Sequence, residues 1–188
     1  CTTILTNRKI SAEYFSFHTT DAEYQLLEKI RHIPKTKFLA GNADFALGIV
    51  TGNNKKYISS VKNKDNEVIL KGSDICKYHT NPNSNYIVFN PQNFQQVAPI
   101  ELYRAPEKLL YRFISSQLVF AYDDKQTLSL NSCNIVIPKL EGLHIKYILA
   151  ILNSRVAQFI YKMDFHSVKV LRSHIENIPI PDVDADTQ

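Results

Sequence analysis

The chain has 188 residues, of which 44% are hydrophobic and 21% are charged, and its formal net charge is +4. These values exclude a disordered chain and predict one globular domain, or one domain with a small appendage. The last sixteen residues carry −4, so the first 172 carry +8. A mildly basic body is compatible with a polyanionic partner, although many proteins share this charge.

Cysteine usage and hydropathy limit the other classes of protein. Cys1, Cys76 and Cys133 are odd in number and far apart, which indicates neither a disulfide framework nor a zinc site and favours a reducing cytoplasm. Cys76 and His79 have a ligand-like spacing, but two ligands do not make a metal site. We expect no membrane partner, because the sequence has neither a basic-then-apolar leader nor a segment long enough to span a bilayer. A chain that begins with Cys looks like a piece of a longer polypeptide.

In chain order, a first short helix is expected before Pro34. Residues 19–21 (TTD) offer good N-caps, and Leu27 and Ile30 support the helical period. The residue before proline disfavours the helical conformation, so the helix should stop near Pro34. We expect residues 1–35 to be an N-terminal helix or linker region.

The character of the sequence changes between residues 38 and 61. Three of the five glycines lie between Gly41 and Gly52, and the runs ALGIV and KYISSV flank TGNNK. Gly and Asn tolerate the positive φ of tight turns, so this pattern predicts a β-hairpin. The turn would present Asn53, Asn54, Lys55 and Lys56 at its tip.

Further short strands are separated by long polar connections. Two of these connections, at 79–85 and 90–99, are rich in Asn, Pro and Ser. Short strands with such loops predict an irregular, curved β structure. The expected strands are residues 68–70, 86–89, 109–114, 118–122 and 135–137.

Residues 143–163 predict one amphipathic helix of about five turns. The charged side chains off the apolar stripe argue against a membrane span. Residues 168–181 are expected to be extended, and residues 182–188 to form a loose acidic tail. The stripe consists of Ile145, Ile148, Leu149, Leu152, Val156, Phe159, Ile160 and Met163.

Sequence motifs for catalysis are weak. An amino-group methyltransferase needs an Asp/Asn-Pro-Pro-aromatic motif, and the runs at 81–84 and 90–93 both lack the second proline. A glycine-rich nucleotide-binding turn is absent as well. Asp123 and Lys125 match the acid-x-Lys triplet of Mg²⁺-dependent nucleases, with Glu101 and Glu107 upstream, which leaves a nuclease as an alternative. Basic residues interleaved with aromatics favour binding to nucleic acid instead.

A family resemblance connects these stretches. The ordered set ALGIVTGNNKKYI, NYIVFNP, EKLLYRFISSQLVFAYDDKQTLSLNS, IPKLEGLHIKYILAILNSRVAQFIY and VKVLRSHIENIPIP resembles the TaqI-like C-terminal specificity domain, over about Phe38 to Pro181. It is similar, more distantly, to the recognition domains of type I specificity subunits. The resemblance implies an α+β fold that joins a twisted, β-helix-like half to a half with a long C-terminal amphipathic helix. The specificity domain would span residues 36–181.

The resemblance also implies a function. A module of this family reads a short double-stranded DNA sequence for a linked N6-adenine methyltransferase domain of a bacterial type II restriction-modification enzyme, and the target adenine is flipped into the methyltransferase. The fragment would have no catalysis and no cofactor of its own. S-adenosylmethionine, and Mg²⁺ if a nuclease is present, would belong to the parent enzyme.

Candidate contact residues fall into two groups. Lys55, Lys56, Arg104, Arg112 and Lys125 would neutralise phosphates. Asn53, Asn54, Lys77 and His79, with the loop 83–85, would contact base edges. Tyr122, Asp123 and Asp124 are expected to shape a strand end, and Asn153 and Ser154 to cap or kink the long helix. A third hypothesis is a domain that docks on a methyltransferase subunit through the helix stripe.

Overall fold

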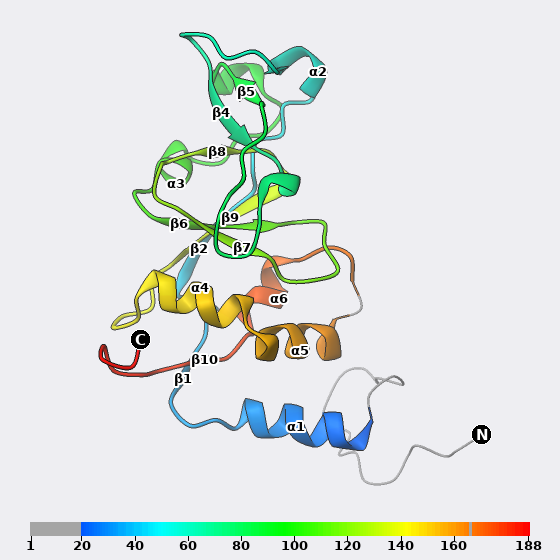
Figure 1. Ribbon diagram of the computed structural model, residues 1–188, viewed down its shortest axis with the longest axis vertical. Helices are drawn as coiled ribbons and strands as arrows, with labels where there is room; N and C mark the ends of the chain where they lie inside the picture. The colour runs from blue at the N-terminus through cyan, green and yellow to red at the C-terminus, as the bar shows by residue number, and fades with distance from the viewer. Residues whose placement is uncertain (1–19, 166) are drawn as a thin grey trace, which may run out of the picture.

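A four-stranded antiparallel sheet crosses the middle of the molecule (Figure 1). The computed structural model describes residues 20–165 and 167–188. The strand order in this central sheet is β2 (Ala43–Ala46), β9 (Cys133–Pro138), β6 (Lys108–Arg112) and β7 (Phe120–Asp123). The mixture of sheets and helices confirms the expected α+β class.

Both faces of the central sheet are buried. In β6, Leu109 and Tyr111 point into one hydrophobic core, while Leu110 points into the other. In β9, Val136 points into the same core as Leu109, and Ile135 points into the same core as Leu110. Alternate side chains of a strand point to opposite faces, so a strand that is buried on both faces is apolar throughout. This burial explains why the runs 109–114 and 135–137 lack polar alternation.

Helices cover one face, called here the helix side. They are α4 (Ile145–Asn153), α5 (Arg155–Asp164) and α6 (Arg172–Glu176). The single helix expected over 143–163 is wrong, because the chain leaves the helical conformation at Ser154, where φ is −65° and ψ is 161°. The Ser154 hydroxyl accepts a hydrogen bond from the Ala157 amide at 3.1 Å and starts α5, which confirms the predicted cap.

The break at Ser154 also changes which face of α5 is buried. Val156, a member of the predicted stripe, is 50% exposed. Ile160 of the stripe is buried as expected, together with Ala157 and Tyr161, which the stripe does not include. A new helix starts with its own phase, so a stripe extrapolated from α4 assigns some of the wrong residues after the break.

The first helix, α1 (Asp21–Arg31), lies beyond α5 at the end of the molecule (Figure 1). Its N-cap is Thr20, which forms a capping box with Glu23, and its end before Pro34 confirms the prediction. Of the N-cap candidates, Thr19 lies outside the described residues. Leu27 and Ile30 pack against Ile160 of α5.

Residues on both sides of the expected domain boundaries make contacts. β1 (Thr36–Lys37) pairs with β10 (Ile180–Pro181) in a two-stranded sheet, which the sequence does not predict. Lys37 forms an ion pair with Asp182 at 2.9 Å. The Gln188 side chain accepts from the His144 amide at 2.6 Å, so the tail that was expected to be loose contacts the start of α4. The boundaries at residues 35 and 181 stay predictions.

A second four-stranded sheet packs on the other face of the central sheet, called here the tip side. Its order is β3 (Ile58–Ser59), β5 (Tyr86–Ile87), β4 (Glu67–Leu70) and β8 (Leu128–Ser129), with β4 and β8 parallel. The hydrophobic core between the sheets contains Ile69, Ile87, Leu110 and Ile135. The short helix α2 (Asn54–Tyr57) lies beside this sheet at the top of Figure 1, and we call the sheet with α2 the tip.

The predicted hairpin at 46–61 is wrong. β2 pairs with β9, and β3 pairs with β5. Between them, Ile49 bridges to Leu130 and Val50 to Gln96. Gly52 does adopt a positive φ of +77°, but it leads into α2 instead of turning the chain back. Long-range pairing therefore overrides the local turn pattern.

The remaining elements differ in how well the sequence predicts them. The expected strands at 68–70, 86–89, 109–114, 118–122 and 135–137 are confirmed as β4, β5, β6, β7 and β9, with shifted ends. Residues 168–181 are not wholly extended, because they contain α6. The β-helix-like arrangement is not confirmed.

The single-turn elements η1 (Gly72–Asp74), η2 (Pro91–Asn93) and α3 (Ile100–Tyr103) are too short to show a period. Within the described ranges, every helix is too short or too polar to cross a membrane.

Candidate functional site

At the tip, the predicted contact residues surround α2. The Asn53 side chain caps this helix by accepting from the Lys56 amide at 3.2 Å. The Asn54 side chain accepts from the Thr51 hydroxyl at 2.6 Å. These two bonds orient the turn and leave the side chains of Lys55 and Lys56 exposed. The four residues therefore lie together, as expected, although on a helical turn and not on a hairpin.

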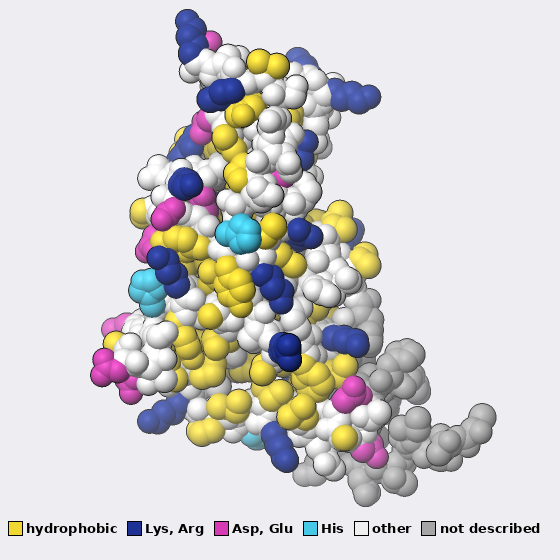
Figure 2. Space-filling view, in the orientation of Figure 1, with side chains coloured by type: hydrophobic (Ala, Val, Ile, Leu, Met, Phe, Trp, Pro, Cys, Tyr) yellow, Lys and Arg dark blue, Asp and Glu magenta, His cyan; other side chains and the backbone are white. Residues whose placement is uncertain are grey.

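A second basic loop at the tip was not predicted from the sequence. It connects β3 to β4 over residues 60–66 and carries the exposed Lys62 and Lys64. The buried Asn66 shapes it, because its amide donates to the Val61 carbonyl and its side-chain oxygen accepts from the Asn63 amide. Figure 2 shows Lys and Arg side chains projecting at two corners of the tip, over α2 and over this loop. The NKDN run at 63–66 is the turn signal that could have identified it.

Lower down, the segment 75–80 crosses the edge of the central sheet. The Lys77 ammonium donates to the Asn153 carbonyl at the end of α4, at 3.0 Å. Tyr78 donates its amide to the Phe120 carbonyl at 2.7 Å and accepts from the Tyr122 amide at 3.2 Å. Lys77 is thus partly buried, whereas His79 is exposed. A cation near a helix C-terminus is stabilised by the helix dipole, so Lys77 anchors this segment.

Two side-chain amides complete the free edge of β7. Asn153 donates to the Phe120 carbonyl at 2.9 Å and accepts from the Phe120 amide at 3.0 Å. Gln158 makes the same pair of bonds to Leu118, at 2.8 and 2.9 Å. Unpaired backbone groups on an edge strand favour pairing with other chains. The helix side chains and the Tyr78 backbone therefore cover this edge together, which the sequence does not reveal.

The loop between η1 and β5 is held by the buried carboxylate of Asp74. Asp74 is fully buried and accepts hydrogen bonds from the Lys71 amide, at 2.8 Å, and from the Asn83 side chain. Arg112 donates to the Ile75 carbonyl at 2.8 Å. Asn83 and Arg112 thus hold the shape of the loop between η1 and β5. Both were predicted as contact residues, and both also have this structural role.

Arg104 forms a bidentate, partly buried ion pair with Glu67 of the tip. Its two terminal nitrogens donate to the two carboxylate oxygens of Glu67 at 2.8 and 2.6 Å, and one of them also donates to the Gln126 carbonyl at 2.9 Å. Hydrogen bonding to Glu67 raises the pKa of the Arg104 guanidinium. Lys125, next to Gln126, is exposed. Arg104 and Lys125 therefore lie close together on one side of the tip.

Asp123 forms an ion pair inside the protein, which argues against the nuclease alternative. Its carboxylate is buried and accepts from the Lys108 ammonium at 2.5 Å, from the Thr127 amide at 3.0 Å and from the Thr127 hydroxyl at 2.6 Å. Burial lowers the pKa of Lys108, which is fully buried, although the ion pair opposes this shift. A Mg²⁺ ion would have to break these bonds to reach Asp123. Over the described ranges, no cluster of three or more His, Cys, Asp or Glu residues could hold a metal ion.

Tyr122 lies next to this pair on the helix side. Its hydroxyl donates to Glu107, and the bond to this carboxylate raises the pKa of Tyr122 to about 12. The Lys146 ammonium of α4 lies 4.7 Å from the centre of the Tyr122 ring. Tyr122 thus shapes the end of β7, as expected, and places a cation on the exposed face.

The helix stripe does not offer a docking surface. Ile148, Leu149 and Leu152 are buried in the helix-side core, and Ile160 packs against α1. Of the stripe, Val156 is half exposed, and a single exposed valine is too small an apolar face for a partner. This burial argues against docking through the stripe.

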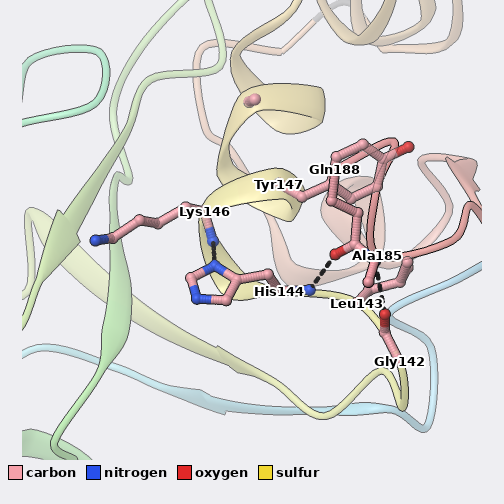
Figure 3. A pocket seen from close by; sticks show the side chains of 8 residues that line it. Gly142, Leu143, His144, Lys146, Tyr147, Ala185 and Gln188 are labelled. Atoms are coloured by element: carbon pink, nitrogen blue, oxygen red, sulfur yellow. Dashed lines mark hydrogen bonds between the residues drawn. The ribbon is translucent and has the colours of Figure 1, made fainter.

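A surface pocket lies between the start of α4 and the end of the chain (Figure 3), and its volume is about 660 Å³. Figure 3 shows Gln188 closing one side, where its amide donates to the Gly142 carbonyl at 2.7 Å. Lys146 extends away from the pocket toward the strands, in agreement with its contact to Tyr122. The pocket gathers none of the predicted contact residues.

Comparisons with known proteins first define the class of fold. A solved structure described as "Structural basis underlying complex assembly and conformational transition of the type I R-M system" matches 86% of this chain and 39% of its own, with 14% identity and a TM-score of 0.52. A crystal structure of an HsdS subunit from Thermoanaerobacter tengcongensis matches with 13% identity and a TM-score of 0.44, over 85% of this chain and 39% of that one. The first likeness shows a shared fold. The chain spans about two fifths of the length of either structure.

Sequence comparison then identifies the family. The TaqI-like C-terminal specificity domain matches residues 67–180, and the chain belongs to this family. It is a specificity domain of restriction-modification systems. The type II methyltransferase M.VspI of Vibrio sp. (strain 343) is 40% identical over 63 residues, which are 34% of this chain and 15% of that protein. The suggested resemblance is thereby confirmed.

Proposed function

We propose that this chain recognises a short sequence in double-stranded DNA and positions a linked N6-adenine methyltransferase on it, without catalysis of its own. The family match over residues 67–180 carries this proposal. The match to part of a type II methyltransferase supports the link to methylation. S-adenosylmethionine, and Mg²⁺ if the parent chain also cleaves, would be bound outside this fragment.

The exposed lysines would provide the affinity. Lys55 and Lys56 on α2, Lys64 on the neighbouring loop and Lys125 beside Arg104 all reach solvent. Lysine neutralises phosphates and releases counterions, so binding should weaken steeply with salt. Arg104 and Arg112 already donate to protein acceptors, and in this proposal they fix the loops and reach phosphate at the edge of the contact.

Base recognition would come from side chains on the two anchored segments. His79 is exposed on the segment that Lys77 ties to α4, and Asn53 and Asn54 lie at the start of α2. Amide and imidazole groups can pair with base edges in the major groove, where one good bidentate pair discriminates by about 1 to 3 kcal/mol. A rigid scaffold with loops of this kind suits sequence recognition, because the loops keep their shape when side chains change.

Fluorescence anisotropy tests the proposal. A labelled mixed-sequence duplex is titrated with the chain at several salt concentrations, and the logarithm of the affinity is plotted against that of the salt concentration. We expect Lys55→Ala/Lys56→Ala to reduce the slope by roughly 2, since each lost phosphate contact changes it by about 1. Lys29→Ala/Lys162→Ala, which removes two exposed lysines from α1 and α5, is the matched control. Absence of binding at low salt would contradict the proposal.

A further inference from the structure

Tyr78 has a backbone conformation that a bulky residue seldom adopts. Its φ is +76°, in the left-handed region where the Cβ atom is crowded. Two backbone hydrogen bonds to β7 hold it there, with the Phe120 carbonyl as acceptor and the Tyr122 amide as donor. Residues in such conformations persist only where the surrounding structure imposes them, and they are concentrated at functional sites.

Among the tyrosines of residues 20–165, Tyr78 differs in being half exposed. Tyr103 and Tyr161 are buried, and their hydroxyls donate to the carbonyls of Leu47 and Ser167. Tyr78 is 50% exposed. Burying an aromatic ring is strongly favourable, so an exposed ring on a strained, anchored residue is best explained by a ligand that covers it.

The surroundings of Tyr78 indicate the kind of ligand. Lys77 and His79 flank it in the chain, and Lys146 lies on the Tyr122 ring, one residue from the bridge between Tyr78 and Ala121. Figure 2 shows hydrophobic side chains mixed with Lys, Arg and His side chains on the face that carries α4. An aromatic platform beside cations suits a polyanion whose units have flat π faces, as nucleic acids do.

We propose that the Tyr78 ring stacks on a nucleobase that has lost its pairing partner in the bound duplex. The inference rests on the proposed function and adds a specific contact to it. Lys77, through the Asn153 carbonyl, and the two bonds to β7 act as positioning groups that hold the ring in place. Stacking on a base face does not depend on the base type, so Tyr78 stabilises an opened base pair and does not select the sequence.

The test compares two labelled duplexes by anisotropy. One is fully paired, and the other has the same sequence with a single abasic position that leaves one base without a partner. We expect the wild-type chain to bind the second duplex about tenfold more tightly, since one base–aromatic stack has roughly this effect. Tyr78→Ala should abolish the preference and keep the salt dependence. Tyr78→Phe should retain the preference, and Tyr24→Ala, on the distant α1, is the control.

Tyr78→Gly provides an independent measurement. Glycine adopts positive φ without strain, so this variant should unfold at a higher denaturant concentration than the wild type while it loses the preference for the abasic duplex. It also replaces Tyr78→Ala if that variant does not fold. Opposite effects on stability and on binding indicate a residue kept in place for its ligand.

The outcomes separate the two proposals. If the wild type binds neither duplex, both the proposed function and this inference fail. If the wild type binds both duplexes equally, or if Tyr78→Ala keeps the preference, only the role of Tyr78 is overturned. A lower stability of Tyr78→Gly would equally contradict the claim that the backbone is strained for function.

Discussion

On the helix side of the central sheet, Leu109, Phe120 and Leu152 meet in a core that long apolar elements build. On the tip side, the core is closed by strands of two to four residues, and inward-pointing polar side chains such as Asn66 and Asp74 determine the loops around it. The helix side is thus stabilised mainly by packing, and the shape of the tip depends on individual hydrogen bonds. A surface of the second kind can present different exposed residues while its inward polar groups keep the backbone in place.

The largest effect should come from the buried ion pair under the tip. Lys108→Met leaves the buried Asp123 carboxylate without its partner, so we expect the free energy of unfolding to fall by about 3 to 5 kcal/mol. Urea denaturation measures this change in the free energy of unfolding. Lys108→Met/Asp123→Leu removes both charges and should recover most of the loss. A loss below about 1 kcal/mol in the single variant would show that water reaches Asp123.

The two amides that cover β7 should differ in importance. Asn153→Leu leaves the buried Phe120 amide without an acceptor and should destabilise the protein by about 2 to 3 kcal/mol. Gln158→Leu removes the same kind of pair to the buried Leu118, but Gln158 itself is partly exposed, so water can enter where its side chain was, and the loss should be about 1 kcal/mol. Equal losses in thermal denaturation would contradict the expected difference between the buried Asn153 and the partly exposed Gln158.

Removing a helix cap should also affect the helix side and the tip differently, with smaller changes in stability. Ser154→Ala removes the cap of α5 and should lower the stability of the whole protein by about 1 kcal/mol. Asn53→Ala removes the cap of α2, whose residues are not buried, so its effect should stay local. Hydrogen exchange should show faster exchange around α2 in Asn53→Ala and unchanged exchange in α4. A global loss of protection in Asn53→Ala would contradict the comparison.

The smallest effect should be a pH dependence on the helix side. His174 is buried against Phe165, with ring centres 3.9 Å apart, and burial lowers the pKa of His174 below its usual value. Below pH 6.5 the unfolded chain therefore binds a proton that the folded chain does not, and stability falls as the pH falls through this range. His174→Gln should flatten this part of the curve of unfolding free energy against pH. An unchanged curve would show that His174 does not contribute.

Local signals in the sequence were sufficient to predict a feature where one short stretch contains all the interacting residues. Thr20 and Glu23 form the capping box that starts α1, and Ser154 caps α5 within the LNS phrase. The runs that became β6 and β9 are apolar enough to be recognised as strands although both of their faces are buried. The candidate residues around α2 were also found together, because neighbours in the sequence share one turn.

Long-range contacts determined the features that local signals did not predict. The run at 46–50 has a turn signal behind it, yet it pairs with β9 and Leu130, which are more than eighty residues away. Asp123 matched a metal-binding triplet until the structure placed Lys108 beside it. Nothing in the sequence around Tyr78 indicates a positive φ, since the bonds that impose it come from β7.

By itself, the sequence determined the α+β class, the family, the strands β4, β5, β6, β7 and β9 and the caps at Thr20 and Ser154, because hydrophobic period and capping depend on residues within a few positions of each other. Only the tertiary structure decided which cations are exposed and which anchor the fold, as it did for Lys55 at the surface and Lys77 at the end of α4. It also placed the Tyr78 ring in solvent. These properties depend on partners brought together by folding, and a linear pattern contains no record of them.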